Sequence, residues 1–512
     1  MDRYDAAVLG SGPEGLVAAV VLARAGLKTL LLDKAEAPGG RARSREFHPG
    51  FRASLYSDEL AAIPNRLYRS LELARHGAVL LPSRASVCLS ASGESVLFAD
   101  EGLNALSVPP AMLPGLTAFR RQIETARAAI ENRAALIATP KRRRWFGARN
   151  ADDRSPAWPD SGFLAASLDE LLGTHICDST LRLHLAADAV SGRAVSPFLT
   201  GTALHALAPG VGGSGQPPSG LGRLAAALAA EARASGVTLR CGAEVTDIHI
   251  RHGRVSSLVV AGTAEVETRA IVSALDLKRT MLGLIHWKEL PDPLVKRVGR
   301  FRMAGARARV LFALDGRPCF AFGRDPPGAG SGPIHVIGTM EALSSAHDVW
   351  RAGVLPEAGL VTLRVPSLAD PRLAPIGKAT MTATLSAIPA QLFDGPWNEE
   401  KRSRLVALAL AAAERAMPGV TSLVLAHQTV TGADLETELG LTGGDLEGGE
   451  IAPDQVLGFR PFGEPEWQDA RTPIHGLYLA GSSAAGAPFF LGVAGERAAR
   501  AMLADLREGR LN

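Results

Sequence analysis

The residues of this chain best suited to chemistry lie near its beginning, where three glycines follow a short apolar run. Gly10, Gly12 and Gly15 give the spacing G-x-G-x-x-G directly after the run 6–9. In such a turn the first glycine permits a tight bend, the second lets the backbone approach a pyrophosphate, and the third lets a helix pack closely on a strand. The alternative is a glycine-rich structural turn. The predicted dinucleotide contacts are Gly10, Ser11, Gly12, Pro13, Glu14 and Gly15.

An acidic residue completes this pattern. The apolar run 29–32 reads as a second strand, and it ends on Asp33, 23 positions after Gly10. A carboxylate at that place accepts hydrogen bonds from the ribose of a bound dinucleotide. We therefore predict that Asp33 and the neighbouring Lys34 contact the ligand, and that this part of the chain forms a Rossmann-like α/β unit.

Two further glycine-rich segments favour FAD over a nicotinamide dinucleotide. Gly40 and Arg41 belong to a Gly-Gly-Arg loop after the acid, where the longer body of FAD extends past the pyrophosphate. Far along the chain, segment 476–482 reads as a strand, and the helix 496–506 follows it. A helix N-terminus there would stabilise the negative edge of a reduced flavin. The remote residues predicted to bind FAD are Gly481, Ser482, Gly492 and Val493.

Short motifs typical of one family of flavoproteins are spread over nearly the whole chain. They are Tyr4-Asp5, Gly39-Gly40-Arg41, Pro49-Gly50-Phe51, Ser219-Gly220-Leu221-Gly222, Gly242-Ala243-Glu244-Val245, Ile271-Val272-Ser273-Ala274, Gly443-Gly444, Gly449-Glu450, Asp454-Gln455, Arg460-Pro461 and the segment 472–481. On these motifs the chain resembles the phytoene desaturase-like branch of the FAD-dependent amine oxidase-type flavoproteins, in the pyridine nucleotide-disulfide oxidoreductase domain protein 2-like group. The resemblance implies that the backbone at Val245 meets the adenine and that Ala274 lies near FAD. It does not fix the substrate.

Two departures from the family pattern fall in segments expected near the isoalloxazine ring. Gly448 stands where the family usually has a histidine, and segment 485–490 replaces a His-Pro-Gly-Gly-Gly run. Neutral change in a loop is one interpretation. The other is that the space over the flavin is reshaped, and on that interpretation Phe489 or Phe490 lines the substrate cavity.

The resemblance implies hydride abstraction from carbon, desaturating an apolar, polyene- or lipid-like substrate. The glycine run 210–215 follows no strand, so no separate nicotinamide domain is predicted, and quinone or oxygen is the expected electron acceptor. Three alternatives stay open: a redox-neutral isomerase that uses reduced FAD, an FAD-dependent amine oxidase, and a non-catalytic flavoprotein that binds a partner. No side chain is identified as a general base, and no Ser/His/Asp arrangement is readable. Arg460 is expected either to line the substrate or to hold its loop through a salt bridge.

Composition narrows the classes of partner. The formal net charge of +3 over 512 residues gives no reason to expect a nucleic acid. Four cysteines far apart in sequence form no C-x-x-C pair, and no metal site is predicted. No signal peptide or run of 18 apolar residues is found, so the expected location is the cytoplasm. Segment 141–146, Lys-Arg-Arg-Arg-Trp-Phe, is either a solvated loop or a peripheral anchor on the inner face of an anionic membrane.

The chain is long enough for two domains, and we expect them to be intertwined. Residues 1–85, 220–285 and 431–512 are predicted to form the FAD-binding domain. Residues 86–219 and 286–430 are predicted to form a mixed α/β substrate domain. The expected elements include helices 116–137, 221–234 and 402–417, a hairpin of strands 245–250 and 255–260, and strands 307–314 and 380–388.

Overall fold

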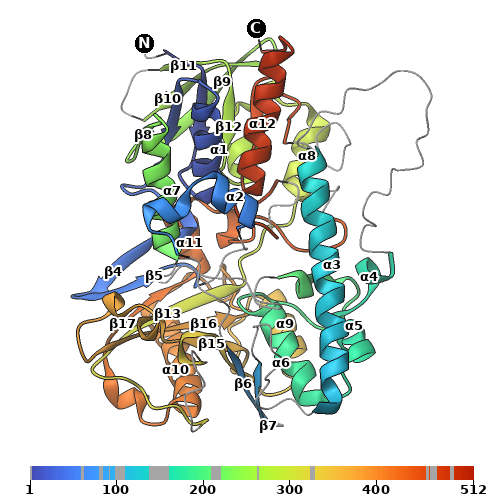
Figure 1. The fold of residues 1–512 in the computed structure, drawn as a ribbon, viewed down its shortest axis with the longest axis vertical. Helices are drawn as coiled ribbons and strands as arrows, with labels where there is room; N and C mark the ends of the chain where they lie inside the picture. The colour runs from blue at the N-terminus through green and yellow to red at the C-terminus, as the bar shows by residue number, and fades with distance from the viewer. Residues whose placement is uncertain are drawn as a thin grey trace.

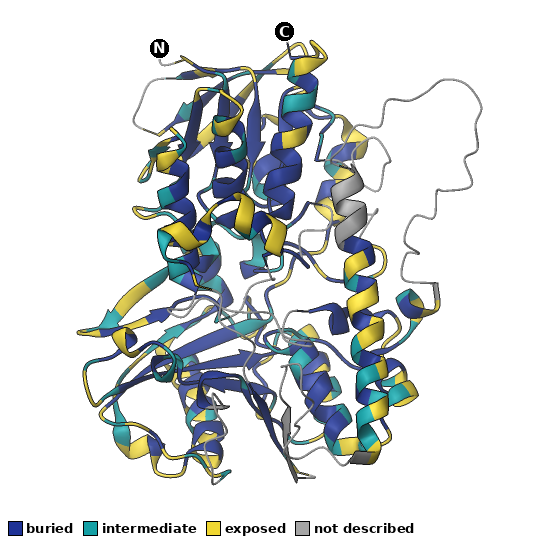
Figure 2. Cartoon of the chain, viewed as in Figure 1, coloured by how far each residue is buried: buried dark blue, intermediate teal, exposed yellow. Residues whose placement is uncertain are grey.

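Two sheet-centred bodies make up the protein, one above the other in Figure 1. The computed structural model describes residues 3–58, 63–79, 85–91, 93–97, 110–137, 161–208, 221–261, 265–322, 329–456, 460–461, 470–484 and 489–511. Both chain termini lie at the outer end of the upper body (Figure 1). Burial is concentrated in the strands and on the helix faces that cover them (Figure 2).

The upper body is built on a parallel sheet of five strands that come from distant parts of the chain. Its order is β18 (Leu477–Leu479), β12 (Ile271–Ser273), β2 (Ala6–Leu9), β3 (Thr29–Leu32) and β8 (Thr238–Arg240). Helices α1 (Pro13–Arg24), α7 (Leu221–Ala234) and α12 (Val493–Arg507) cover one face. The first and last helices of the chain therefore pack side by side beside one sheet.

Side-chain alternation along β2 explains why both faces of this sheet are buried. Ala6 and Val8 point to the helices, whereas Ala7 and Leu9 belong to an apolar cluster on the other face. That second face is covered by a smaller sheet in the order β1 (Arg3–Tyr4), β11 (Val266–Thr268), β10 (Arg254–Val260) and β9 (Val245–Arg251), and by α8 (Asp292–Arg300).

The lower body contains a seven-stranded, largely antiparallel sheet. Its order is β17 (Val424–Val430), β13 (Arg307–Leu314), β16 (Ala379–Ser386), β15 (Val361–Arg364), β14 (Ile334–Val336), β6 (Ser86–Ser90) and β7 (Gly93–Leu97). Helix α10 (Glu399–Ala416) packs on it through Leu405, Ala409 and Ala413. The helices beside it are α3 (Leu113–Ile137), α5 (Leu168–His175), α6 (Ser179–Val190) and α9 (Met340–Arg351).

Shorter elements join the two bodies. The hairpin of β4 (Ser44–His48) and β5 (Phe51–Ser54) reaches from the upper body to the seven-stranded sheet, and α11 (Gly432–Leu439) lies between the bodies. The remaining short helices are α2 (Asn65–Ser70) and α4 (Ser161–Ala165).

The predicted architecture, a Rossmann-like α/β unit intertwined with a mixed α/β unit, is confirmed. The predicted helix 221–234 and strand 307–314 have the observed bounds, and the hairpin 245–260 is present as β9 and β10. The predicted helix 116–137 begins three residues earlier, at Leu113, and the predicted helix 402–417 begins at Glu399 because Asn398 caps it there.

Candidate functional site

The glycine turn after β2 forms an open cradle. Gly10 has φ +91°, and a Cβ on Gly15 would lie 1.9 Å from the carbonyl oxygen of Gly10, so only glycine lets α1 begin this close to the strand. A Cβ built on Gly12 meets no atom within 4 Å, and no side chain caps the helix there. The first-turn amides of α1 are therefore available to an anionic group such as a pyrophosphate.

Asp33 lies beside this turn and holds it in place. One carboxylate oxygen accepts hydrogen bonds from the amide and the hydroxyl of Ser11 at 2.6 and 2.5 Å, and the other accepts one from the amide of Ala35 at 2.8 Å. The next side chain, Lys34, donates from Nζ to the carbonyl of Thr437 at 2.9 Å. Partial burial, followed by the nearby charge of Arg279, lowers the pKa of Lys34. The predicted contact of Asp33 with a ribose stays a prediction.

Glu14 connects the two ends of the chain. Its carboxylate accepts hydrogen bonds from the amides of Gly492 and Gly495 at 2.8 and 3.0 Å, across 478 positions of sequence. Burial raises the pKa of Glu14, against the lowering effect of these amides and of Arg41. The N-terminus of α12 is predicted to face the flavin, but two of its free amides donate hydrogen bonds to Glu14 instead. The sequence alone does not reveal these hydrogen bonds, because they depend on contact between helices α1 and α12.

One pocket collects most of the predicted cofactor residues. Those that line it are Gly10, Gly12, Pro13, Glu14, Asp33, Lys34, Gly40, Arg41, Val245, Ala274 and Ser482. Ser11, Gly15, Gly481, Gly492 and Val493 instead support its walls: a Cβ on Gly481, for example, would lie 2.3 Å from the carbonyl oxygen of Leu275. The open cradle at Gly12 and the charge of Arg41 fit the pyrophosphate of FAD.

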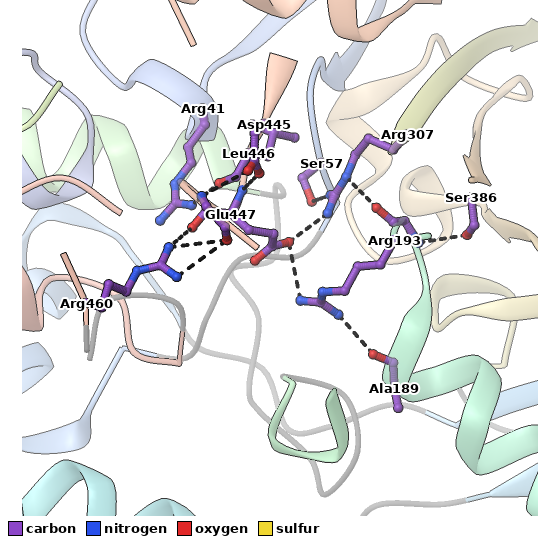
Figure 3. A network of polar contacts seen from close by, with 12 residues as sticks. Arg41, Ser57, Ala189, Arg193, Arg307, Ser386, Asp445, Leu446, Glu447 and Arg460 are labelled. Atoms are coloured by element: carbon purple, nitrogen blue, oxygen red, sulfur yellow. Dashed lines mark hydrogen bonds and ion pairs between the residues drawn. The ribbon is translucent and has the colours of Figure 1, made fainter. Parts of the chain in front are cut away.

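A second, larger cavity of about 730 Å³ lies where the two bodies meet. Segments 192–205, 299–307 and 444–453 supply most of its lining. Arg41 of the first pocket donates from Nη1 to the carbonyl of Leu446, a residue of the larger cavity, at 2.6 Å. The loop 444–449 lines the larger cavity, and its Leu446 contacts Arg41 of the first pocket (Figure 3).

Charged side chains gather at this loop, and we call Arg193, Arg307, Asp445 and Glu447 the cavity cluster (Figure 3). One oxygen of Glu447 accepts hydrogen bonds from Arg193 at 3.3 Å and from Arg307 at 2.8 Å. Burial would raise the pKa of Glu447, but the charges of Arg193, Arg307 and Arg41 outweigh it and lower the pKa to about 2. Burial and the charge of Glu447 raise the pKa of Asp445 to about 6, although two backbone amides donate to its carboxylate.

Arg460 lies beside the cavity cluster and is almost fully buried. Its guanidinium donates to a ring of backbone carbonyls, including those of Gly448 at 2.7 Å, Glu447 at 2.9 Å and Ser482 at 3.0 Å. Burial lowers the pKa of Arg460 to about 10. Of the two interpretations left open for Arg460, this geometry favours holding the loop, through carbonyl oxygens rather than through a salt bridge.

The family departures have different structural settings. A Cβ on Gly448 would lie 2.4 Å from Cβ of Ser482, so a histidine does not fit this backbone without a shift. Phe489 and Phe490 are buried in the apolar cluster that also contains Ile451, and among the described residues neither lines the larger cavity. Residues 485–488, the glycine run 210–215 and the basic segment 141–146 lie outside the described residues.

The structure also brings together a Ser/His/Asp group that the sequence did not reveal. We call Ser86, His184, Asp188, His335 and Thr362 the sealed cluster. Asp188 accepts from Ser86 Oγ at 2.8 Å and contacts His335 Nε2 at 2.8 Å, while His184 Nε2 lies 2.8 Å from Ser86 Oγ. Within the described residues, none of the five lines either cavity. No spacing pattern could have shown this group, because its members come from β6, α6, β14 and β15.

Comparison with known proteins agrees with this geometry. The sequence profile of flavin containing amine oxidoreductases matches residues 15–303. The chain belongs to this family. It is 28% identical to the rat (Rattus norvegicus) pyridine nucleotide-disulfide oxidoreductase domain-containing protein 2, over 99% of this chain and 94% of that protein. It is 27% identical to hydroxyneurosporene desaturase of Rhodobacter capsulatus, over 98% of both.

Solved structures show the same fold. Cyclohexylamine oxidase of Brevibacterium oxydans superposes with a TM-score of 0.58 at 14% identity, covering 99% of this chain and 100% of that one. As a member of this flavin-dependent family the protein is an oxidoreductase with FAD as its cofactor, as predicted. Within the described residues, no helix combines the length and apolar character needed to span a bilayer, and no group of three metal-binding side chains occurs.

Proposed function

We propose that the protein is an FAD-dependent dehydrogenase that desaturates a carbon–carbon bond of an extended, partly apolar substrate. The observation that carries this proposal is that the 730 Å³ cavity lies next to the dinucleotide pocket, with Arg41 of the pocket hydrogen-bonded to Leu446 of the cavity lining. Bound FAD supplies a two-electron acceptor that takes a hydride from carbon. The similarity to a hydroxyneurosporene desaturase supports desaturation over other flavin chemistry.

The residues of the chain have distinct roles in this proposal. The backbone at Gly10 and Gly12 and the guanidinium of Arg41 would hold the pyrophosphate, and Asp33 the ribose. Val245 and Ala274 would border the adenine side, and Ser482 the flavin side. Residues 1–85, 220–285 and 431–512 would act as the FAD-binding domain, and the rest as the substrate domain. Quinone or oxygen would return the enzyme to its oxidised state.

An amine oxidase is the second candidate, because solved amine oxidases share the fold. The cavity lining argues against it: six cationic side chains face three acidic ones, which disfavours an ammonium substrate. A redox-neutral isomerase and a non-catalytic flavoprotein differ from a dehydrogenase in whether substrate reduces the flavin.

Anaerobic bleaching of the flavin absorbance of the purified holoenzyme separates these candidates. Bleaching by a polyene or a saturated acyl compound is the expected result, and bleaching by primary amines alone would identify an amine oxidase. An isomerase would instead convert substrate only after the enzyme is reduced by dithionite. A flavoprotein that responds to none of these compounds, in either redox state, would contradict the proposal.

The FAD site itself is tested by Gly12→Val. A Cβ at position 12 meets no protein atom within 4 Å, so the fold is expected to survive while the added side chain excludes the pyrophosphate. We expect colourless, folded protein with a melting temperature equal to that of the wild-type apoprotein. Gly173→Ala, in helix α5, is the matched control and should retain FAD. A yellow Gly12→Val protein would contradict the assignment.

A further inference from the structure

The larger cavity carries more positive than negative charge at its inner wall. Two guanidiniums, Arg193 and Arg307, share the single carboxylate of Glu447. Both arginine side chains are nearly buried, with 12% and 11% of their surface exposed. One carboxylate cannot neutralise both, so the charge of this wall depends on the other charged side chains around it.

The other acidic group nearby, Asp445, balances one of these charges. It is buried, and the amides of Glu447 and Gly449 donate to its two oxygens. Arg41 and Arg460 add two more guanidiniums around the same loop, so that four guanidiniums there surround two carboxylates (Figure 3). The backbone carbonyls around Arg460 accept its hydrogen bonds, but they carry no net charge and do not neutralise the guanidinium.

Positive charge extends from this wall along the cavity lining. Lys278, Arg300 and Arg351 line the same cavity, and the latter two are exposed. Clefts lined by one sign of charge attract ligands of the opposite sign. His205 also lines the cavity; it is 6% exposed, and within the described residues its Nδ1 has no hydrogen-bond partner.

Apolar side chains line the same space beside the charges. Val195, Leu199, Met303, Trp350 and Ile451 are examples. A ligand that matches the whole cavity therefore has an acidic end and an apolar body. The planar fork of arginine binds a carboxylate through two parallel hydrogen bonds, which suits a carboxylate as the acidic end.

We propose that the cavity binds an aliphatic carboxylate, with its head group on Arg193 and Arg307 and its chain along the apolar lining. This inference rests on the proposed function, for which it names the substrate class. It places an anion where the guanidiniums of Arg41, Arg193, Arg307 and Arg460 surround the two carboxylates of Asp445 and Glu447.

Three eight-carbon probes test the proposal on the holoenzyme: octanoate, methyl octanoate and n-octylammonium, each titrated by calorimetry at low salt. We expect octanoate to bind about tenfold more tightly than the ester, with the advantage shrinking as salt is added. Octylammonium should bind most weakly. Equal affinity for octanoate and the ester would overturn the proposal.

Two variants should move the octanoate affinity in opposite directions. Arg307→Met removes one of the two guanidiniums assigned to the head group and keeps the pair of Arg193 and Glu447, so the variant should fold but lose the preference for octanoate. Glu447→Gln leaves two unpaired guanidiniums, so octanoate should bind several-fold more tightly and raise the melting temperature more than in the wild type. Arg404→Gln, on the exposed side of α10, is the control and should change neither. An unchanged preference in Arg307→Met would overturn the proposal even if Glu447→Gln fails to fold.

These measurements also distinguish this inference from the proposed function. Preferential octanoate binding together with a flavin that no carbon substrate reduces would uphold the anion site and reject the dehydrogenase. Reduction by neutral substrates without any octanoate preference would do the reverse.

Discussion

The cavity cluster and the sealed cluster contain similar kinds of side chain but differ in balance and access. In the sealed cluster one carboxylate, Asp188, is surrounded by hydroxyl and imidazole groups in the apolar core beside β6. In the cavity cluster two guanidiniums share one oxygen of Glu447, Arg41 and Arg460 add positive charge around it, and the group lines a space of about 730 Å³.

The hydrogen bonds of the sealed cluster run mostly between its own members, and Thr362 also contacts Ser191 Oγ at 2.7 Å. His335 reaches Thr362 through Nδ1 at 2.9 Å and Asp188 through Nε2 at 2.8 Å, so both ring nitrogens have partners. Burial lowers the pKa of His184 to about 4, which keeps its ring neutral at ordinary pH. A Ser/His/Asp arrangement is therefore not by itself an active site: here it lies in the core and lines neither cavity, whereas the cavity cluster lines a space with room for a ligand.

The sharpest test of this contrast is Asp188→Ala. The substitution removes the acceptor that Ser86 and His335 share in a buried site, and each buried donor left unsatisfied costs about 1–3 kcal/mol of unfolding free energy. Urea denaturation measures it. Asp394→Ala removes a carboxylate that is 67% exposed and paired to Lys401, and should cost under about 1 kcal/mol. A loss as small as that in Asp188→Ala would mean that the sealed cluster does not stabilise the core.

One buried group in each cluster should also change the unfolding free energy with pH, and the two changes should have opposite signs. His184 has a folded pKa of about 4 against an ordinary 6.5, so between these values the unfolded chain binds a proton that the folded chain does not. Protonation of His184 in the unfolded chain therefore lowers the unfolding free energy as pH falls, by up to about 3 kcal/mol. Asp445 has a folded pKa of about 6 against 3.8, so its stabilisation is present at low pH and is lost as pH rises through 6.

Unfolding free energies at pH 4 to 6.5 would separate the two contributions. His184→Asn should flatten the rise of stability with pH, because the variant has no imidazole to protonate. Asp445→Asn should make the same rise steeper. Parallel profiles for both variants and the wild type would contradict the assignment of burial as the cause of either shift.

Within the cavity cluster's surroundings, Arg460 should behave as part of the framework. Arg460→Lys keeps the charge but loses most of the hydrogen bonds to Gly448, Glu447 and Ser482, at a cost of about 2 kcal/mol in unfolding free energy. The preference for octanoate over its ester should stay unchanged, because the guanidinium of Arg460 is hydrogen-bonded to backbone carbonyls and does not bind the ligand in this proposal. A lost preference with unchanged stability would instead make Arg460 a ligand contact.

The same contrast explains how much the sequence could predict. The turn at Gly10 to Gly15 and the strand ending on Asp33 are local, so the FAD pocket could be located from spacing. Other contacts depend on the packing of elements hundreds of residues apart. These are the hydrogen bond between Glu14 and Gly492 and the ion pairs of Glu447 with Arg193 and Arg307. The charge pattern along the chain gives no sign that Glu447 and these two arginines meet, so the sequence predicts an apolar or partly apolar substrate without an acidic end.

The smallest expected effect comes from Arg193→Lys, and it distinguishes the charge of the cavity cluster from its shape. Lysine keeps a positive charge near Glu447, so the unfolding free energy should change by under about 1 kcal/mol. It lacks the planar fork that pairs with both oxygens of a carboxylate, so octanoate should bind about threefold more weakly while the ester is unaffected. If charge alone attracts the ligand, Arg193→Lys will bind octanoate as the wild type does, and the cavity then selects any anion rather than a carboxylate.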